Sequence, residues 1–217
     1  MTNSKGLRFE KFDLHVHTPA SYDFNDKTVT PVQIIEEAIS KGLKAIAITD
    51  HNTGEWVDKI IEAAEGKDLT IFPGVEIYCT GGEKGIHVIA ILDVTKRTKH
   101  ISAILSELKI DPDDFGKKKA VTNKSVYDVI NVITSNPING IAVLAHCTSS
   151  KGVLNEIKGE TRTEIFKHPK LLAVESSFHD FTDADKIQKK TRAVDLLNGK
   201  DENFNYRHLG VYITSDS

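Results

Sequence analysis

The sequence predicts an α/β fold in which seven strands, most of them separated by helices, form a distorted (β/α)7 barrel of the TIM type. Short apolar runs alternate with segments of helical spacing, and this alternation favours parallel strands joined by right-handed crossovers. Histidine and carboxylate residues recur at the ends of the apolar runs. Strand ends converge on one mouth in a barrel but are spread along an edge in an open doubly wound sheet, so the pattern favours the barrel.

Each element follows from local signals. Thr30 and Pro31 are typical of an N-cap and a first helical position, and Gly42 of a helix end. We expect strands at residues 12–16, 43–49, 69–77, 86–92, 140–145, 171–175 and 209–214. We expect helices at residues 31–41, 56–65, 101–108, 126–133 and 185–197.

The composition is that of one globular domain spanning residues 1–217. Its 28 Lys plus Arg against 31 Asp plus Glu give a formal net charge of -3, so no overall positive field attracts nucleic acid. Binding to nucleic acid would need local basic clusters, such as residues 117–119 and 186–192, although such runs are more often solvated faces. The sequence shows neither a membrane-spanning apolar run nor a signal peptide, so we expect a cytoplasmic protein without a membrane partner.

The segment Asp13-Leu14-His15-Val16-His17 predicts two parallel imidazoles, because residues i and i+2 of a strand project from the same face. Neutral imidazole is a common metal ligand. Further candidate ligands stand at or beside other strand ends: His51, Glu76, His87, His146 and Asp216. Nitrogen and carboxylate ligands without a thiolate suit zinc, manganese or iron. The two cysteines, Cys79 and Cys147, have no paired spacing and predict no disulfide or zinc knuckle.

This set of ligands is too large for one tetrahedral ion. Two or three divalent ions, with neighbours about 3.5–4 Å apart, bind a phosphate oxygen, generate hydroxide near neutral pH and stabilise the attacking and leaving oxygens. The sequence therefore predicts a metal-dependent phosphoesterase, a phosphatase or a nuclease. Its substrate would be a small phosphomonoester or the end of a nucleic acid.

Five ordered motifs resemble those of the PHP (polymerase and histidinol phosphatase) family: Asp13-Leu14-His15-Val16-His17, Thr49-Asp50-His51, Gly74-Val75-Glu76, Ala145-His146 and Ser215-Asp216-Ser217. The resemblance implies a distorted (β/α)7 barrel with a trinuclear metal centre. It assigns His15, His17, Glu76 and Asp216 to the first ion, and these four would act in catalysis through the metal ions. It assigns Glu76, His87 and His146 to the second ion, and Asp23 and His51 to the third. Asp23 stands where some relatives have histidine.

The last motif departs from the family pattern. Members typically continue it as Ser-Asp-Ser-His, and that histidine completes the third site, but this chain stops at Ser217. We therefore expect a C-terminally truncated barrel that is a fragment of a longer chain. The sequence of the first motif also resembles that of PHP domains fused to an AAA-like or SMC-like ATPase region. This resemblance would make a downstream ATPase region a partner.

Other residues suggest how a substrate would bind. Ser149 and Lys151 follow His146 and offer a hydroxyl and an ammonium group to a phosphate. Glu175, at a strand end, is expected to orient a metal-bound histidine. Two other functions stay open: an amidohydrolase-type barrel, which also begins with His-x-His, and a catalytically weak PHP module that supports an attached ATPase or polymerase. The amidohydrolase pattern usually adds a bridging lysine on a middle strand, and no lysine here stands at a matching strand end.

Overall fold

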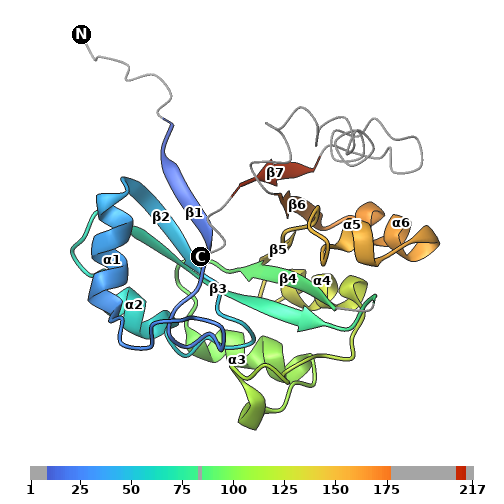
Figure 1. The fold of residues 1–217 in the computed structure, drawn as a ribbon, viewed down its shortest axis with the longest axis horizontal. Helices are drawn as coiled ribbons and strands as arrows, with labels where there is room; N and C mark the ends of the chain where they lie inside the picture. The colour runs from blue at the N-terminus through green and yellow to red at the C-terminus, as the bar shows by residue number, and fades with distance from the viewer. Residues whose placement is uncertain (1–8, 83–84, 177–208, 214–217) are drawn as a thin grey trace.

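The computed structural model describes residues 9–82, 85–176 and 209–213. Seven strands form one curled sheet in the order β1-β2-β3-β4-β5-β6-β7, a barrel-like trough with helices along its outer side (Figure 1). The strands are β1 (Lys11–Val16), β2 (Leu43–Ile48), β3 (Thr70–Cys79), β4 (Ile86–Ile91), β5 (Ile141–Leu144), β6 (Leu171–Glu175) and β7 (Gly210–Tyr212). The helices are α1 (Pro31–Ser40), α2 (Val57–Ala63), α3 (Thr98–Glu107), α4 (Val126–Thr134), α5 (Val153–Glu156) and α6 (Gly159–Lys167), with a 3-10 turn η1 (Pro112–Asp114).

The expected barrel-like α/β architecture is confirmed, but the expected parallel pairing is wrong at one strand. β4 runs antiparallel to both β3 and β5, whereas the other neighbouring pairs are parallel. A glycine-rich connection at residues 80–85 joins β3 to β4. A parallel crossover needs a dozen or more residues, so a connection of this length permits only a hairpin. The reversal brings the first residues of β4 to the edge where the other strands end.

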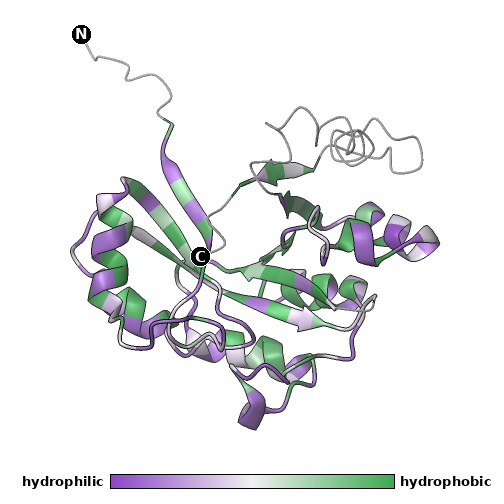
Figure 2. Cartoon of the chain, in the orientation of Figure 1, coloured by the Kyte–Doolittle hydropathy of each residue, from purple (hydrophilic) through white to green (hydrophobic). Residues whose placement is uncertain are grey.

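Two apolar layers hold the sheet in place. The larger layer lies between the sheet and the helices and includes Ile35, Ile60, Ile104 and Ile130. A smaller cluster inside the curl consists of Ala47, Ile89, Ile91, Val143 and Ala145. Strands that are covered on both faces read as nearly continuous apolar runs, which is why they stand out in the sequence. Figure 2 shows long hydrophobic segments along these strands and hydrophilic ones on α6.

Helix α1 illustrates how local sequence fixes an element. The Thr30 side chain accepts a hydrogen bond from the backbone N–H of Gln33, whose side chain accepts one from the Thr30 backbone N–H. Pro31 occupies the first turn, and Gly42 follows the helix with a φ of 71°, a conformation that favours glycine. The capping residues therefore set both ends of this helix as the sequence predicts.

Some elements differ from expectation or lie outside the described part. Helices α5 and α6 were not predicted, because α6 has a polar composition and α5 is only one turn long. The helix expected at residues 185–197 and the candidate ligand Asp216 fall outside the described residues. Within the described ranges, the helices are too short and too polar to cross a membrane.

Candidate metal centre

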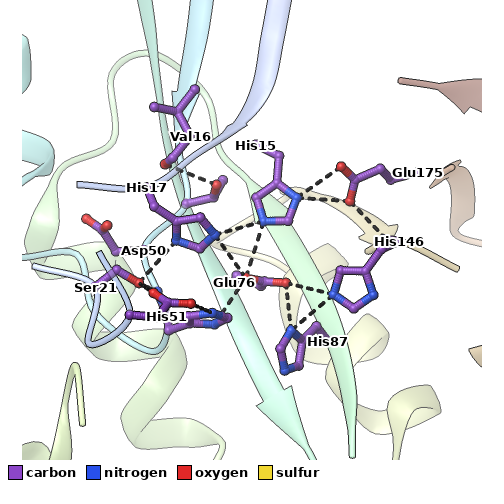
Figure 3. Close-up of polar contacts among 12 residues, drawn as sticks. His15, Val16, His17, Ser21, Asp50, His51, Glu76, His87, His146 and Glu175 are labelled. Atoms are coloured by element: carbon purple, nitrogen blue, oxygen red, sulfur yellow. Dashed lines mark hydrogen bonds and ion pairs between the residues drawn. The ribbon is translucent and has the colours of Figure 1, made fainter. Parts of the chain in front are cut away.

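Five strand ends deliver histidine and carboxylate side chains to one place. His15 lies on β1 and His17 directly follows it, while His51 follows β2 and Glu76 lies on β3. His87 is the second residue of β4, and because β4 is antiparallel to its neighbours, its beginning meets the ends of β3 and β5. His146 follows β5. The structure thus brings the five candidate histidines His15, His17, His51, His87 and His146 around Glu76 (Figure 3).

Backbone pairing continues past the end of β2 and fixes the segment that carries His51. The N–H of Glu76 donates to the carbonyl of Asp50 at 3.1 Å, and the N–H of Asn52 donates to the carbonyl of Glu76 at 2.9 Å. His51 and Glu76 form an isolated parallel bridge between these two bonds. The polar loop is therefore an extension of the sheet, which places His51 beside Glu76 with little freedom.

The two carboxylate oxygens of Glu76 face two different groups of histidines. Oε2 lies 3.2 Å from His15 Nε2, 3.4 Å from His17 Nε2 and 3.0 Å from His51 Nδ1. Oε1 lies 2.8 Å from His87 Nδ1 and 3.5 Å from His146 Nε2. Glu76 is 1% exposed, so one buried carboxylate joins five imidazoles.

Three of these histidines use their second nitrogen to contact an outer partner. The partners are Glu175 for His15 at 2.9 and 3.1 Å, Ser21 for His17 at 3.1 Å, and Ser149 for His146 at 3.3 Å. An ionised carboxylate only accepts hydrogen bonds, so His15 donates to Glu175 through Nδ1. Outer partners of this kind are what orient imidazole ligands in metal sites.

Glu175 also holds the loop after β5. Its Oε2 accepts a hydrogen bond from the backbone N–H of His146 at 2.9 Å, and its carbonyl accepts one from the N–H of Cys147 at 2.9 Å. His146 itself has a φ of 31°, an uncommon conformation for a residue other than glycine. A Cβ atom at Gly152 would lie only 2.4 Å from two carbonyl oxygens of the loop, so the tight turn requires glycine there.

The donor geometry fits divalent ions. The ligand atoms of three groups lie within 4.8 Å of one another: His15, His17 and Glu76; His17, Asp23 and His51; and His51, Glu76 and His87. His15 Nε2 and His17 Nε2 are 3.2 Å apart, and so are His87 Nδ1 and His146 Nε2. Among the described residues, the buried Nδ1 of His51 has no aligned hydrogen-bond partner, although Glu76 Oε2 is 3.0 Å away. Lone pairs that converge in this way suit a shared cation.

The electrostatics of the site also favour positive charge. Burial lowers the pKa of His15, but the hydrogen bonds and charges of Glu175 and Glu76 outweigh it and raise that pKa to about 11. Burial would raise the pKa of Glu76, yet its contacts with His146, His15 and His87 hold it well below the usual range. Burial, aided by His15 and His51, lowers the pKa of His17 to about 4 against the opposing charge of Glu76. Two buried carboxylates thus attract a proton or a cation to this place, while burial favours the neutral form of His17.

A pocket of about 730 Å³ opens above these residues. His17, His51, Glu76, His87 and His146 contribute to its floor, while Ser149, Ser150 and Lys151 line another part of its wall. The structure therefore places the two candidate substrate residues, Ser149 and Lys151, in the same pocket as the candidate ligands. Asp23 lines it too, with its Oδ2 3.0 Å from His51 Nε2.

Two residues of the site were not singled out from the sequence. Ser21 is fully buried, and its hydroxyl forms hydrogen bonds with the side chains of His17 and Asp23. Tyr22 stacks on the His51 ring, with ring centroids 4.8 Å apart. Asp50, by contrast, belongs to the motif Thr49-Asp50-His51, but its carboxylate is directed to Thr18 and not to the candidate ligands. It accepts hydrogen bonds from the backbone N–H and the hydroxyl of Thr18, at 2.6 and 2.7 Å. Only the contacts across the loop reveal these roles, since Ser, Tyr and Thr are ordinary loop residues.

A barrel-like α/β sheet with clustered histidines and carboxylates at one end of its strands is the architecture of metal-dependent hydrolases. The chain belongs to the PHP domain family, whose model matches residues 13–174.

Several relatives have assigned activities. The chain is 30% identical over 100 residues to a 5'-3' exoribonuclease of Haemophilus influenzae, which covers 46% of this chain and 35% of that protein. It is 27% identical over 79 residues to a 3',5'-nucleoside bisphosphate phosphatase of Chromobacterium violaceum, covering 36% of this chain and 26% of that one. The chain thus spans about a third or less of the length of these two relatives.

Solved structures show the same fold. A protein of Bifidobacterium adolescentis, assigned by prediction as a metal-dependent phosphoesterase, superposes with a TM-score of 0.63 and 20% identity, covering 96% of this chain and 88% of that one. A Chromobacterium violaceum protein described as an amidohydrolase, solved with bound sulfate and no metal, has a TM-score of 0.58 and 17% identity over 94% of this chain and 86% of that one. At these identities, the likeness concerns the fold.

Proposed function

We propose that the chain is a metal-dependent phosphoric ester hydrolase whose divalent ions bind around Glu76. The observation that carries this proposal is that the two oxygens of Glu76 contact different histidines: Oε2 faces three and Oε1 faces two. A carboxylate shared between two cation sites about 3.5–4 Å apart is typical of enzymes that hydrolyse phosphate esters. The names of the relatives, an exoribonuclease and a nucleotide phosphatase, support the same chemistry.

The proposed ligand sets follow the two oxygens of Glu76. The first ion would be held by His15, His17 and Glu76, together with Asp216, which lies outside the described residues. The second ion would be held by Glu76, His87 and His146. A third would use Asp23 and His51, whose side chains meet at 3.0 Å. Zinc, manganese and iron suit this nitrogen and oxygen donor set.

Bound ions of this kind polarise a phosphate ester and stabilise the charge that develops during its hydrolysis. The chain's own residues would prepare the site for that reaction. Glu76 fixes the spacing of the ligand groups, and Glu175 orients His15 and the backbone of His146. Lys151 is exposed at the pocket wall, where its ammonium group would attract the phosphate.

The substrate would be a small phosphomonoester or the phosphorylated end of a nucleic acid. A pocket of about 730 Å³ has room for a group larger than phosphate beside the ligands. The ring of Tyr22 and the side chain of Phe24 line it, next to the polar floor. The formal net charge of -3 argues for recognition within this pocket rather than along an extended basic surface.

The test combines metal analysis with hydrolysis. The purified protein is stripped of metal, reloaded with manganese or zinc, and assayed with an aryl phosphate and with a 5'-phosphorylated oligonucleotide. We expect two or three ions per chain, together with hydrolysis of at least one substrate that EDTA abolishes and the metal restores. His17→Ala should lose an ion and the activity, whereas His100→Ala, which removes a histidine that caps α3 away from the site, should keep both.

The alternatives give different outcomes. Normal ion content without hydrolysis of either phosphoester would contradict the proposal and favour a PHP module that supports an attached ATPase or polymerase. Hydrolysis of an amide in place of a phosphoester would favour an amidohydrolase. Absence of bound ions would remove the basis of both enzymatic functions.

A further inference from the structure

The loop after β1 contains a hydroxyl that connects three of the proposed ligands. Ser21 has an exposed fraction of 0%, and its Oγ lies 2.8 Å from Asp23 Oδ1, 3.3 Å from the backbone N of His51 and 3.1 Å from His17 Nδ1. The three partners belong to separate parts of the chain, since His17 follows β1, Asp23 lies in the loop and His51 follows β2. Figure 3 shows Ser21 between the rings of His17 and His51.

The number of donors and acceptors on a serine hydroxyl decides which of these hydrogen bonds it donates and which it accepts. A serine hydroxyl has one hydrogen to donate and two lone pairs to accept with. The Asp23 carboxylate can only accept, so the serine hydrogen goes to Asp23, and the backbone N–H of His51 donates to Oγ. His17 Nδ1 then faces a lone pair, and this contact is a hydrogen bond only if Nδ1 carries the proton. With the proton on Nδ1, a neutral His17 ring has its lone pair on Nε2, which lies 3.4 Å from Glu76 Oε2.

The backbone around Ser21 holds this hydroxyl in place. The Ser21 N–H donates to the carbonyl of Thr18 at 2.8 Å, and the N–H of Phe24 donates to the Ser21 carbonyl at 3.2 Å. Lys27 donates through its ammonium group to the carbonyls of Ser21 and of Pro19. Thr18 is tied to the buried Asp50 through two hydrogen bonds. The loop is therefore anchored on both sides of Ser21 by hydrogen bonds.

We propose that Ser21 is a positioning residue that fixes the Nδ1–H tautomer of His17 and aligns Asp23 and His51 for divalent ions. The inference rests on the proposed function for its purpose, but the tautomer and the alignment belong to the chain itself. A free histidine ring favours the other tautomer, with the proton on Nε2, and that form cannot bind a cation through the nitrogen that faces Glu76. Ser21 thus selects the form of His17 that acts as a ligand.

The first test reads the tautomer directly, in metal-free protein with nitrogen-15 in its histidine rings. Two-dimensional NMR that correlates ring nitrogens with ring protons distinguishes Nδ1–H from Nε2–H. We expect Nδ1–H at His17 in the unaltered protein and a shift toward Nε2–H in Ser21→Ala. Nε2–H at His17 in the unaltered protein overturns the proposal, and this readout decides it even if Ser21→Ala fails to fold.

The second test measures the binding of manganese and zinc to the metal-free proteins by calorimetric titration. Ser21→Ala should bind its ions roughly 10- to 100-fold more weakly, the loss typical of removing an outer partner of a ligand. Thr122→Val is the matched control, because Thr122 is also fully buried and donates its hydroxyl hydrogen to a carbonyl, that of Leu108. The control should lose stability yet keep the affinity for ions and the His17 tautomer. Unchanged affinity and tautomer in a folded Ser21→Ala would contradict the positioning role.

Neither readout uses a substrate, so the two proposals fail separately. A protein that shows Nδ1–H at His17 and binds ions, but hydrolyses no phosphoester, contradicts only the proposed function. A protein that hydrolyses phosphoesters with an unchanged tautomer and affinity in Ser21→Ala contradicts only the role of Ser21.

Discussion

The two sides of Glu76 differ in how deeply their histidines are buried. On the Oε2 side, the side chains of His15, His17 and His51 are 0%, 9% and 6% exposed. On the Oε1 side, those of His87 and His146 are 19% and 21% exposed. His17 and His51 also line the pocket, but with less exposed surface. One carboxylate therefore joins a closed half of the site to an open half.

The two sides also differ in their outer support. On the Oε2 side, His15 has Glu175 at 2.9 Å and His17 has Ser21 at 3.1 Å. On the Oε1 side, the His146 ring has Ser149 at 3.3 Å, and Glu175 bonds to the His146 backbone and not to its ring. Rings that are buried and bonded at both nitrogens lose little freedom when they bind an ion. We expect the Oε2 side to hold its ion tightly, and the Oε1 side to be where a phosphate reaches the centre.

The largest effect should come from the residue that both sides share. Glu76→Gln removes the negative charge between five imidazoles, and leaving such buried charges unbalanced typically costs about 3–5 kcal/mol. We expect kcat/KM with an aryl phosphate to fall roughly 10³-fold or more, and the ion content to fall on both sides. Metal analysis and steady-state kinetics check this, with the exposed Glu65→Gln as control. Loss of ions from one side alone would show that the two sides are independent.

A second effect concerns the support of the Oε2 side and its dependence on pH. Burial raises the pKa of Asp50 to about 7 against the lowering effect of the Thr18 hydrogen bonds. A carboxyl whose pKa is higher in the folded state favours folding while it is protonated, so this contribution is lost as pH rises from about 4 to about 7. At about 1.4 kcal/mol per pKa unit, the change is at most about 4 kcal/mol.

Asp50→Asn should remove this dependence, because an amide has no charge and can still accept from the Thr18 N–H. Urea unfolding of the metal-free proteins between about pH 4.5 and pH 7.5 gives the comparison. The stability of Asp50→Asn relative to the unaltered protein should increase with pH. A constant difference across this range would mean that Asp50 is already ionised at the acid end.

The strands and most of the site follow from the sequence because their signals are local. Strands β2, β4 and β5 are buried along most of their length and read as apolar runs, and the polar residues beside the strands mark the edge where candidate ligands gather. His15 and His17 illustrate this, since strand periodicity alone places both rings on one side. Their closeness to Glu76 required only that the strand ends meet.

What the sequence did not reveal depends on direction and on long-range contacts. Periodicity does not encode whether a strand runs parallel or antiparallel, so the antiparallel direction of β4 was not predicted. The short connection at residues 80–85 did indicate it, because a connection of that length allows only a hairpin. Ser21 and Tyr22 sit in an irregular loop whose course is fixed by Asp50 and Lys27, through contacts that no local pattern indicates. The polar composition of α6 likewise concealed a helix.

Removing outer partners should affect the two sides unequally. Glu175→Gln takes a charge from His15 and weakens the hydrogen bond to the His146 backbone, so we expect the tightest ion to bind roughly 10- to 100-fold more weakly. Ser149→Ala removes a long contact on the open side and should change ion affinity by less than about fivefold, since a typical hydrogen bond contributes about 1 kcal/mol or less at such exposure. Calorimetric titration checks both variants. Equal losses would erase the distinction between a supported and a loosely held side.

The smallest effect should come from the rim of the open side. Lys151 is exposed in the pocket wall, and a solvated ammonium group contributes only about 0.2–1 kcal/mol to an ionic contact. Lys151→Ala should therefore raise the KM for a phosphoester about two- to fivefold and leave kcat and the ion content unchanged. The increase should shrink in salt, because mobile ions screen an exposed charge but not a buried one. Lys59→Ala, which removes an exposed lysine on α2, is the control. A fall in kcat instead would place Lys151 in the reaction itself and make the open side more than an entrance.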